Sequence, residues 1–236
     1  GGADEFAPHP VLQALGDALH LTAGLFALGA INAALYERER TGLGRMIDVS
    51  MLDSQIAILE NAVARYAVTG KPPGPLGARH PSITPFEAYE TQDGYLIIAA
   101  GNNKLFTDLC SGLNRPELAT DPRFLTNSDR AANVDALKTE LEITLKTKPT
   151  AHWLNVLDAA GVPHGPINNV EQALNDPQVR ARNMVVHMRD PDGPDLMMAG
   201  NPIKISGVAD PSTRPPAPKL DADRAKILAE LGLTDE

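Results

Sequence analysis

The stretch PFEAYETQDGYLIIAAG, residues 85–101, decides the fold class because it has the pattern of a β-hairpin. Aromatic and β-branched residues, which favour strands, predict one strand near 86–90 and a second at 95–100. The tripeptide Gln-Asp-Gly at 92–94 supplies the turn between them, since an Asp-Gly pair readily adopts the backbone angles of a tight hairpin. We therefore expect strands among segments that otherwise have mainly helical patterns.

Helical patterns surround this hairpin on both sides. Before it, one helix is predicted over 17–39, with Asp17 as its N-cap and the glycines of TGLG (41–44) at its end. RMIDVSM (45–51) alternates apolar and polar residues, which predicts a strand, and a second helix is predicted at 52–68. After the hairpin, a proline-rich turn is predicted at 160–169, and helices at 104–113, 130–146, 150–160, 170–176 and 221–232.

The segment GKPPGPLGARHPS (70–82) is the best candidate for a domain boundary, because it is dense in glycine and proline. We expect a linker at 71–82 and a compact α+β unit at 83–180, between outer segments 1–70 and 181–236. Neither outer segment can make a complete domain separately. They must pair with each other or complete something that lies outside this sequence.

Composition and charge exclude several function classes. The 236 residues are 43% hydrophobic and 22% charged, as in ordinary soluble globular proteins, and the net charge is −9. No basic stripe stands out, so neither nucleic acid nor an anionic membrane is expected as a partner. The longest apolar run, 21–36, is short for a membrane span, and the N-terminus lacks the pattern of a signal peptide. The single cysteine, Cys110, is typical of a reducing compartment and predicts a cytoplasmic protein.

The sequence contains none of the familiar metal, hydrolase or nucleotide motifs. The histidines form no HxH or HExxH spacing and pair with no cysteine motif, so no metal site is expected. There is also no GxSxG elbow and no GxxxxGK[ST] loop. The candidates for chemistry are therefore single residues at the ends of predicted elements.

Asp17 and the segment AAGNNKLF (99–106) each have a structural and a functional interpretation. An aspartate at the start of a helix is usually a cap, but the same position could hold a nucleophile at the mouth of a pocket. In the second segment a strand ends just before Asn102, so backbone N–H groups at the next helix start could bind an anion, with help from Lys104. The alternative is that Asn102 caps a surface helix.

The segment ARHPSITPF (78–86) follows a flexible stretch of glycine and proline. It carries three polar side chains that could contact a substrate, those of Arg79, His80 and Ser82. Such a segment can act as a lid over a site, or it can be a plain crossing between domains. The residues by themselves leave both interpretations open.

Several stretches taken together resemble the class III CoA-transferase family, the CaiB/BaiF type, which includes formyl-CoA and carnitine CoA-transferases. They cover nearly the whole chain in the order of the family's C-terminal part. RHPSITPF (79–86), GNN (101–103) and AGVPHGPINN (160–169) look most similar to members that move CoA between dicarboxylic acids. The other stretches are ALGD (14–17), GLFALGAINAALYERERTGLG (24–44), IDVSMLDSQ (47–55), DPRFLTNSDR (121–130), WLNVLDAAGVPHGPINNVEQALNDPQVRARNMV (153–185) and LGLTDE (231–236).

The resemblance implies an α/β fold class with two kinds of domain. A Rossmann-like large domain would be built from both ends of the chain, from 1–70 with the catalytic helix and from the end of 181–236. The small α+β domain at 83–180 would be inserted through linkers. The family forms interlocked dimers, so a homodimer is expected. An N-terminal region or chain, which in the family supplies most of the CoA-binding surface, would complete the protein.

The resemblance also implies that Asp17 is the catalytic nucleophile, because ALGD matches the local motif of the family's aspartate. Asp17 stands 25 residues before Gly42, about one helical turn more than in the family pattern. One extra turn leaves Asp17 near the same side of the helix, which favours it. An ungapped match anchored on Gly24 would instead put His20 in the aspartate's place, and no carboxylate would then be there to carry an acyl group.

The implied reaction moves CoA from an acyl-CoA thioester to a free carboxylic acid, a dicarboxylic one, through an aspartyl anhydride and thioester. Arg79, His80 and Ser82 are expected to bind the substrate, and Asn102 and Lys104 to bind CoA. CoA enters as the substrate thioester, and no metal is required. The expected partners are an acyl-CoA, a small carboxylic acid and a second copy of the chain.

Two alternatives to CoA transfer stay open at the level of sequence. α-Methylacyl-CoA racemases resemble the same family and use an aspartate with a histidine to exchange an α-proton. That histidine would lie upstream of this chain, so the racemase is not excluded, although RHPSITPF and GNN favour transfer. The second alternative is a truncated, non-catalytic fragment that only dimerises.

Overall fold

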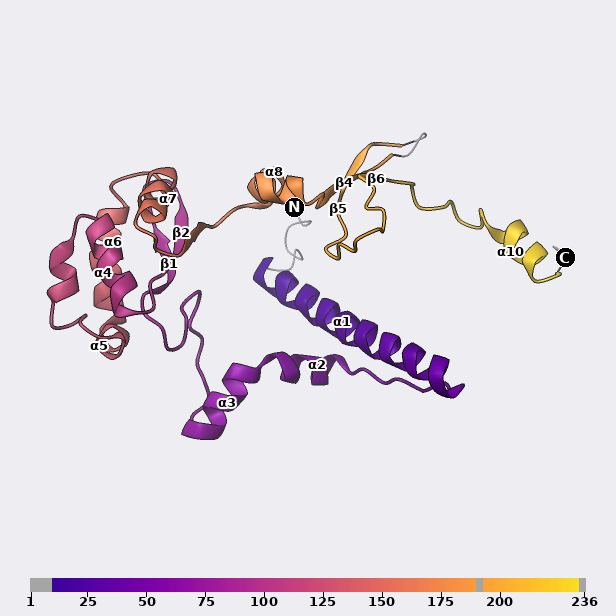
Figure 1. Ribbon diagram of the computed structural model, residues 1–236, viewed down its shortest axis with the longest axis horizontal. Coiled ribbons are helices and arrows are strands. Elements are labelled where there is room, and N and C mark those ends of the chain that lie inside the picture. The colour runs from indigo at the N-terminus through magenta and orange to yellow at the C-terminus, as the bar shows by residue number, and fades with distance from the viewer. Residues whose placement is uncertain (1–9, 190–192, 234–236) are drawn as a thin grey trace, which may run out of the picture. The chain divides into compact units, whose positions relative to one another are not determined.

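The computed structural model describes residues 10–189 and 193–233 (Figure 1). The chain divides into two compact units, with the division after Gly77. That position falls within the 71–82 range expected as a linker, while the assignment of both outer segments to one large domain stays a prediction. Strands and helices are mixed, as the sequence predicts.

The first unit is helical. It contains α1 (Pro10–Thr41), α2 (Met51–Ile58) and α3 (Glu60–Thr69). The Ser50 hydroxyl caps α2 by accepting the N–H of Asp53 at 3.2 Å, and α3 ends at Gly70, whose φ of 65° is the left-handed conformation typical of glycine after a helix.

The strand predicted at 45–51 is wrong for this structure. Residues 43–50 carry no strand, and α2 already begins at Met51. Alternation of apolar and polar residues marks a segment that can be a strand, but the strand forms only when a neighbour accepts and donates its backbone hydrogen bonds. Within the described part of the chain, no strand pairs with these residues.

The first unit exposes most of its apolar side chains. All buried hydrophobic residues of the described chain lie between Tyr89 and Val186, in the second unit. In α1, Leu25 and Tyr36 are each 68% exposed. The Ala18–Thr41 part of α1 is 24 residues long and apolar enough to cross a membrane, although core helices of soluble proteins have the same composition. The expectation of no membrane partner therefore stays a prediction.

The predicted hairpin is confirmed and forms the centre of the second unit. β1 (Phe86–Glu90) and β2 (Tyr95–Ala99) pair antiparallel, with Ala88 opposite Ile97. β3 (His164–Pro166) adds to the other edge of β2, giving the order β1-β2-β3. The proline-rich turn predicted at 160–169 thus contains a short strand. The sequence of this segment predicts only a turn. The strand forms because β2 supplies a hydrogen-bonding partner, which the local sequence does not reveal.

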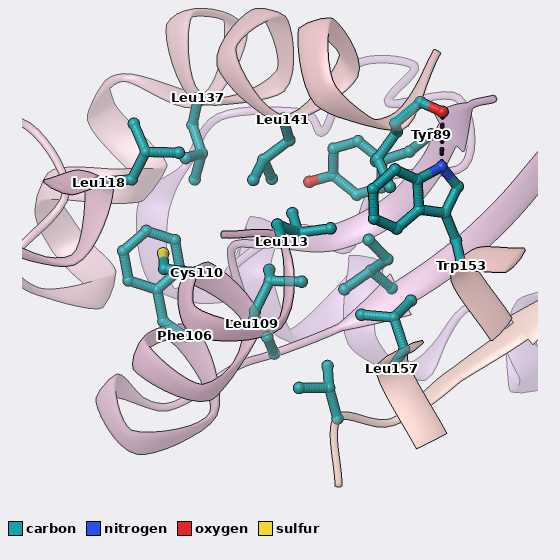
Figure 2. Packing of buried hydrophobic residues seen from close by; sticks show 14 of the residues in the cluster. Tyr89, Phe106, Leu109, Cys110, Leu113, Leu118, Leu137, Leu141, Trp153 and Leu157 are labelled. Atoms are coloured by element: carbon teal, nitrogen blue, oxygen red, sulfur yellow. Dashed lines mark hydrogen bonds between the residues drawn. The ribbon is translucent and has the colours of Figure 1, made fainter. Parts of the chain in front are cut away.

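Helices pack on this sheet and enclose the core (Figure 2). They are α4 (Asn103–Gly112), α5 (Asn127–Ala132), α6 (Val134–Leu145) and α7 (Thr150–Ala159), with a short 3-10 helix, η2 (Pro116–Thr120). Leu137, Leu141 and Leu145 repeat on one face of α6 and are fully buried. The Trp153 indole N–H donates to the Leu145 carbonyl at 2.7 Å, which anchors α7 to α6.

The remainder of the second unit is less regular. α8 (Val170–Asn175) and α9 (Pro177–Ala181) lead to a second sheet, which is mixed and has the order β5-β4-β6. α10 (Arg224–Glu230) follows it. The strands of this sheet are β4 (Val185–Met188), β5 (Leu196–Ala199) and β6 (Thr213–Arg214). β5 is exposed along its whole length, so this sheet has one edge with little cover in the described chain.

Leu141→Ala should lower the free energy of unfolding of the second unit by about 2–5 kcal/mol, because it removes a fully buried side chain and leaves a cavity. Ile143→Ala is the matched control: Ile143 lies on the same helix but is 59% exposed, and the change should stay within about 0.5 kcal/mol. Urea unfolding followed by the fluorescence of Trp153, the single tryptophan, makes the comparison. Equal losses in the two variants would contradict the assigned core.

Candidate active site

The position of Asp17 differs from the prediction. α1 begins at Pro10, so Asp17 lies in the third turn of the helix and is not an N-cap. Proline suits the first helical position, because its missing N–H would have no partner there. Asp17 stands about 10 Å along the axis from the start of α1, beyond the first turn in which the helix dipole acts strongly. The N-cap position predicted for Asp17 is therefore wrong for this structure.

His20 follows Asp17 by three residues in the same helix. Residues three apart lie on one side of an α-helix, so the two positions considered for the nucleophile are neighbours on α1. The side chain of His20 is exposed. Helical spacing alone does not choose between them, and the assignment of the nucleophile to Asp17 stays a prediction.

The segment from Arg79 to Phe86 is held by its own hydrogen bonds. The Nδ1 atom of His80 accepts the backbone N–H groups of Ser82 and Ile83 at 3.2 and 3.0 Å. The His80 N–H donates to the Phe86 carbonyl at 2.8 Å, and the two rings stack with centroids 5.2 Å apart. Arg79 and His80 are half-buried and Ser82 is exposed. These contacts favour a fixed loop over a mobile lid.

The bonding of His80 fixes where its proton sits. An imidazole nitrogen that accepts two N–H groups carries no proton, so the neutral ring has its proton on Nε2. Nε2–H is then a hydrogen-bond donor whose direction is set by the stacked ring. This is the atom of His80 that can contact a carboxylate or a thioester oxygen.

The Gly101-Asn102-Asn103 turn begins α4 as an ordinary cap. The side-chain oxygen of Asn102 accepts the N–H of Leu105 at 2.9 Å. Lys104 is 83% exposed and its ammonium pairs with Asp108 at 2.6 Å. Both side chains thus have local structural partners, and their expected role in binding CoA stays a prediction.

The loop and the turn lie against each other. A Cβ atom on Gly101 would come within 2.5 Å of the Cγ2 atom of Ile83. In addition, the N–H of Ala100 donates to the Pro85 carbonyl at 2.8 Å. The end of β2 therefore needs glycine at 101 because the loop packs directly on it, and two segments singled out in the sequence share one edge of the sheet.

Two residues that sequence reasoning missed complete this edge. Asn127 Oδ1 accepts the Thr84 N–H at 3.0 Å, and Asn127 Nδ2 donates to the Ser82 carbonyl at 2.8 Å. Arg130 is fully buried and donates to the Thr84 carbonyl at 2.7 Å. Both come from α5, which is capped by Thr126 in a capping box. Both residues stand in DPRFLTNSDR (121–130), a stretch that resembles the family, but no role was predicted for them, because arginine and asparagine near a helix start are usually exposed.

Other reactive groups are accounted for by structure. Cys110 is buried in the core, and burial raises the pKa of its thiol to about 12, so it is not a nucleophile at neutral pH. Within residues 10–189 and 193–233, no group of three His, Cys, Asp or Glu residues could hold a metal ion. A cavity of about 940 Å³ in the second unit, beside Gly94, Leu154 and Asn169, is lined by none of the residues expected to bind substrate or CoA.

The predicted site residues fall in both units of the chain. Asp17 belongs to the first unit, and the second unit holds the five others, Arg79, His80, Ser82, Asn102 and Lys104. Within the second unit the structure brings the His80 loop and the Gly101 turn together. The proposal that Asp17 shares a site with them stays a prediction.

Comparison with known proteins identifies the family. The model described as "CoA-transferase family III" matches residues 2–224, and the chain belongs to this family. An acetyl-CoA:oxalate CoA-transferase from Acetobacter aceti is 49% identical over 210 residues, 89% of this chain and 53% of its own length. A succinyl-CoA:glutarate CoA-transferase from Mus musculus is 38% identical over 216 residues, 92% of this chain and 49% of its own length.

A solved structure agrees with the family assignment. A CaiB/BaiF family protein from Brucella suis matches with a TM-score of 0.74 and 40% identity, over 89% of this chain and 54% of that one. The chain thus spans about half the length of the curated relatives it matches. The resemblance to the C-terminal part of a class III CoA-transferase is confirmed.

Gly101→Ala should lower the free energy of unfolding by about 1–3 kcal/mol, because its Cβ would displace the stiff β-branched side chain of Ile83. Gly165→Ala on β3, where an added Cβ meets nothing within 4 Å, is the control and should cost less. In an Ile83→Ala background the penalty of Gly101→Ala should shrink, which a double-mutant cycle measures. Additive penalties would contradict the packing of the loop on Gly101.

Proposed function

We propose that the protein moves CoA from an acyl-CoA thioester to a free dicarboxylic acid, with Asp17 as the covalent nucleophile. Membership of CoA-transferase family III supports CoA transfer as the type of reaction. The names of its relatives support dicarboxylic acids as acceptors, since they act on oxalate and glutarate. Because this chain spans about half of each relative, the activity of the whole protein is part of the proposal.

A carboxylate suits this chemistry because it conserves the energy of the thioester. The Asp17 carboxylate attacks the donor carbonyl and the carbon–sulfur bond breaks. CoA thiolate is released, and a mixed anhydride between Asp17 and the donor acid is formed. The thiolate then attacks the aspartyl carbonyl and releases the donor acid, which gives an aspartyl thioester. The acceptor carboxylate reverses both steps. No water and no net proton enter, so exclusion of water from the intermediates is the main requirement.

The second unit would supply contacts to the acid and to CoA. His80 offers its Nε2–H, and Arg79 and Ser82 lie beside it in a loop held by backbone hydrogen bonds. A fixed donor costs no reorganisation when negative charge develops on a substrate oxygen. Asn102 and Lys104 at the start of α4 are proposed to contact CoA, whose phosphates suit a cation and helix N–H groups.

The active form is proposed to contain more chain than these residues. The first unit leaves Leu25 and Tyr36 exposed, and exposed apolar patches of this kind mark interaction surfaces. The side-chain nitrogen of Gln55 is also buried with no hydrogen-bond partner in the described structure. An N-terminal region or chain that completes a Rossmann-like domain, within an interlocked, cytoplasmic homodimer, would satisfy both features.

Asp17→Asn should reduce CoA exchange by a factor on the order of 10³ or more in the complete assembly, because an amide does not form the anhydride. Hydroxylamine added during turnover should trap a hydroxamate on the peptide that contains Asp17, seen by mass spectrometry. Asp158→Asn, an exposed carboxylate on α7, is the control and should keep wild-type exchange. Exchange is followed with a labelled acid and its CoA ester.

His20→Gln separates the two candidate positions. Retained exchange in this variant, together with loss in Asp17→Asn, would support Asp17. Undiminished exchange in Asp17→Asn would contradict the mechanism, and loss of an α-proton without any acceptor acid would identify a racemase instead. The three outcomes are distinguishable because each gives a different combination of CoA exchange and α-proton loss.

A further inference from the structure

Arg130 joins three segments that are far apart in the sequence. Its Nε donates to the Thr84 carbonyl at 2.7 Å, and one Nη donates to the Phe124 carbonyl at 3.0 Å. The other Nη donates to the side-chain oxygen of Asn103 at 3.2 Å. The guanidinium thus holds together the His80 loop, the loop before α5 and the start of α4, and it is fully buried in doing so.

The partners of this buried cation are carbonyl dipoles and an aromatic ring. Within the described chain, its hydrogen bonds go to three backbone carbonyls and one amide oxygen. The Cζ atom also lies 4.6 Å from the centroid of the Phe106 ring, and burial lowers the pKa of the guanidinium. A buried charge is costly and rare, so a hydrophobic side chain would fill this place at less cost if packing were its only task.

These hydrogen bonds also help to fix the orientation of the His80 ring. Arg130 fixes the carbonyl of Thr84, and Asn127 fixes the N–H of Thr84 and the carbonyl of Ser82. The N–H groups of Ser82 and Ile83, in turn, hold His80 Nδ1. The direction of Nε2–H therefore depends on a chain of contacts that starts at the guanidinium.

We propose that Arg130 is a positioning residue, which acts with Asn127 to aim the Nε2–H of His80 at a carboxylate oxygen of the free acid substrate. This inference rests on the proposed function, in which His80 binds substrate. Arginine suits the task because its planar fork reaches several acceptors at once, whereas a lysine ammonium is a single point on a flexible stem. Arg130→Lys keeps the charge and should lose the fork.

The first test uses the 236-residue chain and needs no catalysis. In the wild type, nitrogen NMR of His80 should show one tautomer, with Nδ1 unprotonated. In Arg130→Lys, amide exchange of Ser82 and Ile83 should speed up by about tenfold or more, because hydrogen bonds to a charged donor are lost, and the single tautomer signature should disappear. Arg123→Lys is the matched control, since Arg123 also lies over a phenylalanine ring but is 47% exposed and pairs with Asp121.

Asn127→Ala gives a second route to the same readout. It removes the two hydrogen bonds to Ser82 and Thr84 from a half-buried position, and it should also loosen the His80 loop. If Arg130→Lys proves unfolded by Trp153 fluorescence, Asn127→Ala decides the matter. Wild-type exchange and an unchanged tautomer in the folded variant would overturn the inference.

The second test uses the complete assembly and separates this inference from the proposed function. Arg130→Lys should raise KM for the free acid by about tenfold, while acylation of Asp17 by the donor thioester continues. An unchanged KM with a loosened loop would overturn the link between Arg130 and the acid and leave CoA transfer intact. Absence of acyl-Asp17 already in the wild type would instead overturn the proposed function, and this inference with it.

Discussion

The contact between the buried Arg130 guanidinium and the Thr84 carbonyl is the interaction on which the candidate site of the second unit depends. Without it, the loop that carries His80 would be held by the two hydrogen bonds of Asn127, by its neighbour Phe86 and by the packing of Ile83 on Gly101. The contact fixes the His80 loop, which follows a stretch rich in glycine and proline. It also costs free energy of desolvation, which the surrounding carbonyls and the ring of Phe106 offset.

The two units of the chain differ in how many of their apolar side chains they bury. The second unit encloses a core of leucines and aromatic residues between a small sheet and its helices. The first unit buries no hydrophobic residue in its described part and leaves the apolar side chains of α1 in contact with solvent. Exposed apolar surface of this kind marks an interaction site. In the proposed function, an N-terminal region or chain would supply the cover.

Features set by neighbouring residues could be predicted from the sequence. The hairpin at 86–99 follows from strand-forming residues and an Asp-Gly turn, both of which act locally. The predicted strand at 45–51 is absent and strand β3 was not predicted. Both errors have one cause, because strand formation depends on a partner distant in sequence. The start of α1 was misplaced because Asp17 is a good cap in isolation, although Pro10 carried a competing signal for an earlier start.

Functional residues were found unevenly for the same reason. His80 and the Gly101 turn stand in segments with a family resemblance, and the structure brings these segments together. Arg130 and Asn127 also stand in such a segment, 121–130, but no role was predicted for them, because their importance lies in burial and in acceptors more than forty residues away along the chain, at Ser82 and Thr84. No periodicity or motif reports such contacts, and a surface-type residue gives no warning that it is enclosed.

In the proposed mechanism, a carboxylate of α1 carries the acyl group during CoA transfer. The path of the oxygen atoms shows whether it does. If the acceptor carboxylate attacks the aspartyl thioester and CoA then takes the acceptor acyl group, one acceptor oxygen stays behind on the aspartate. An acid labelled with heavy oxygen should therefore leave one heavy atom in the peptide that contains Asp17, as mass spectrometry would show. A peptide that remains unlabelled while CoA is exchanged would show that Asp17 forms no anhydride with the acceptor acid.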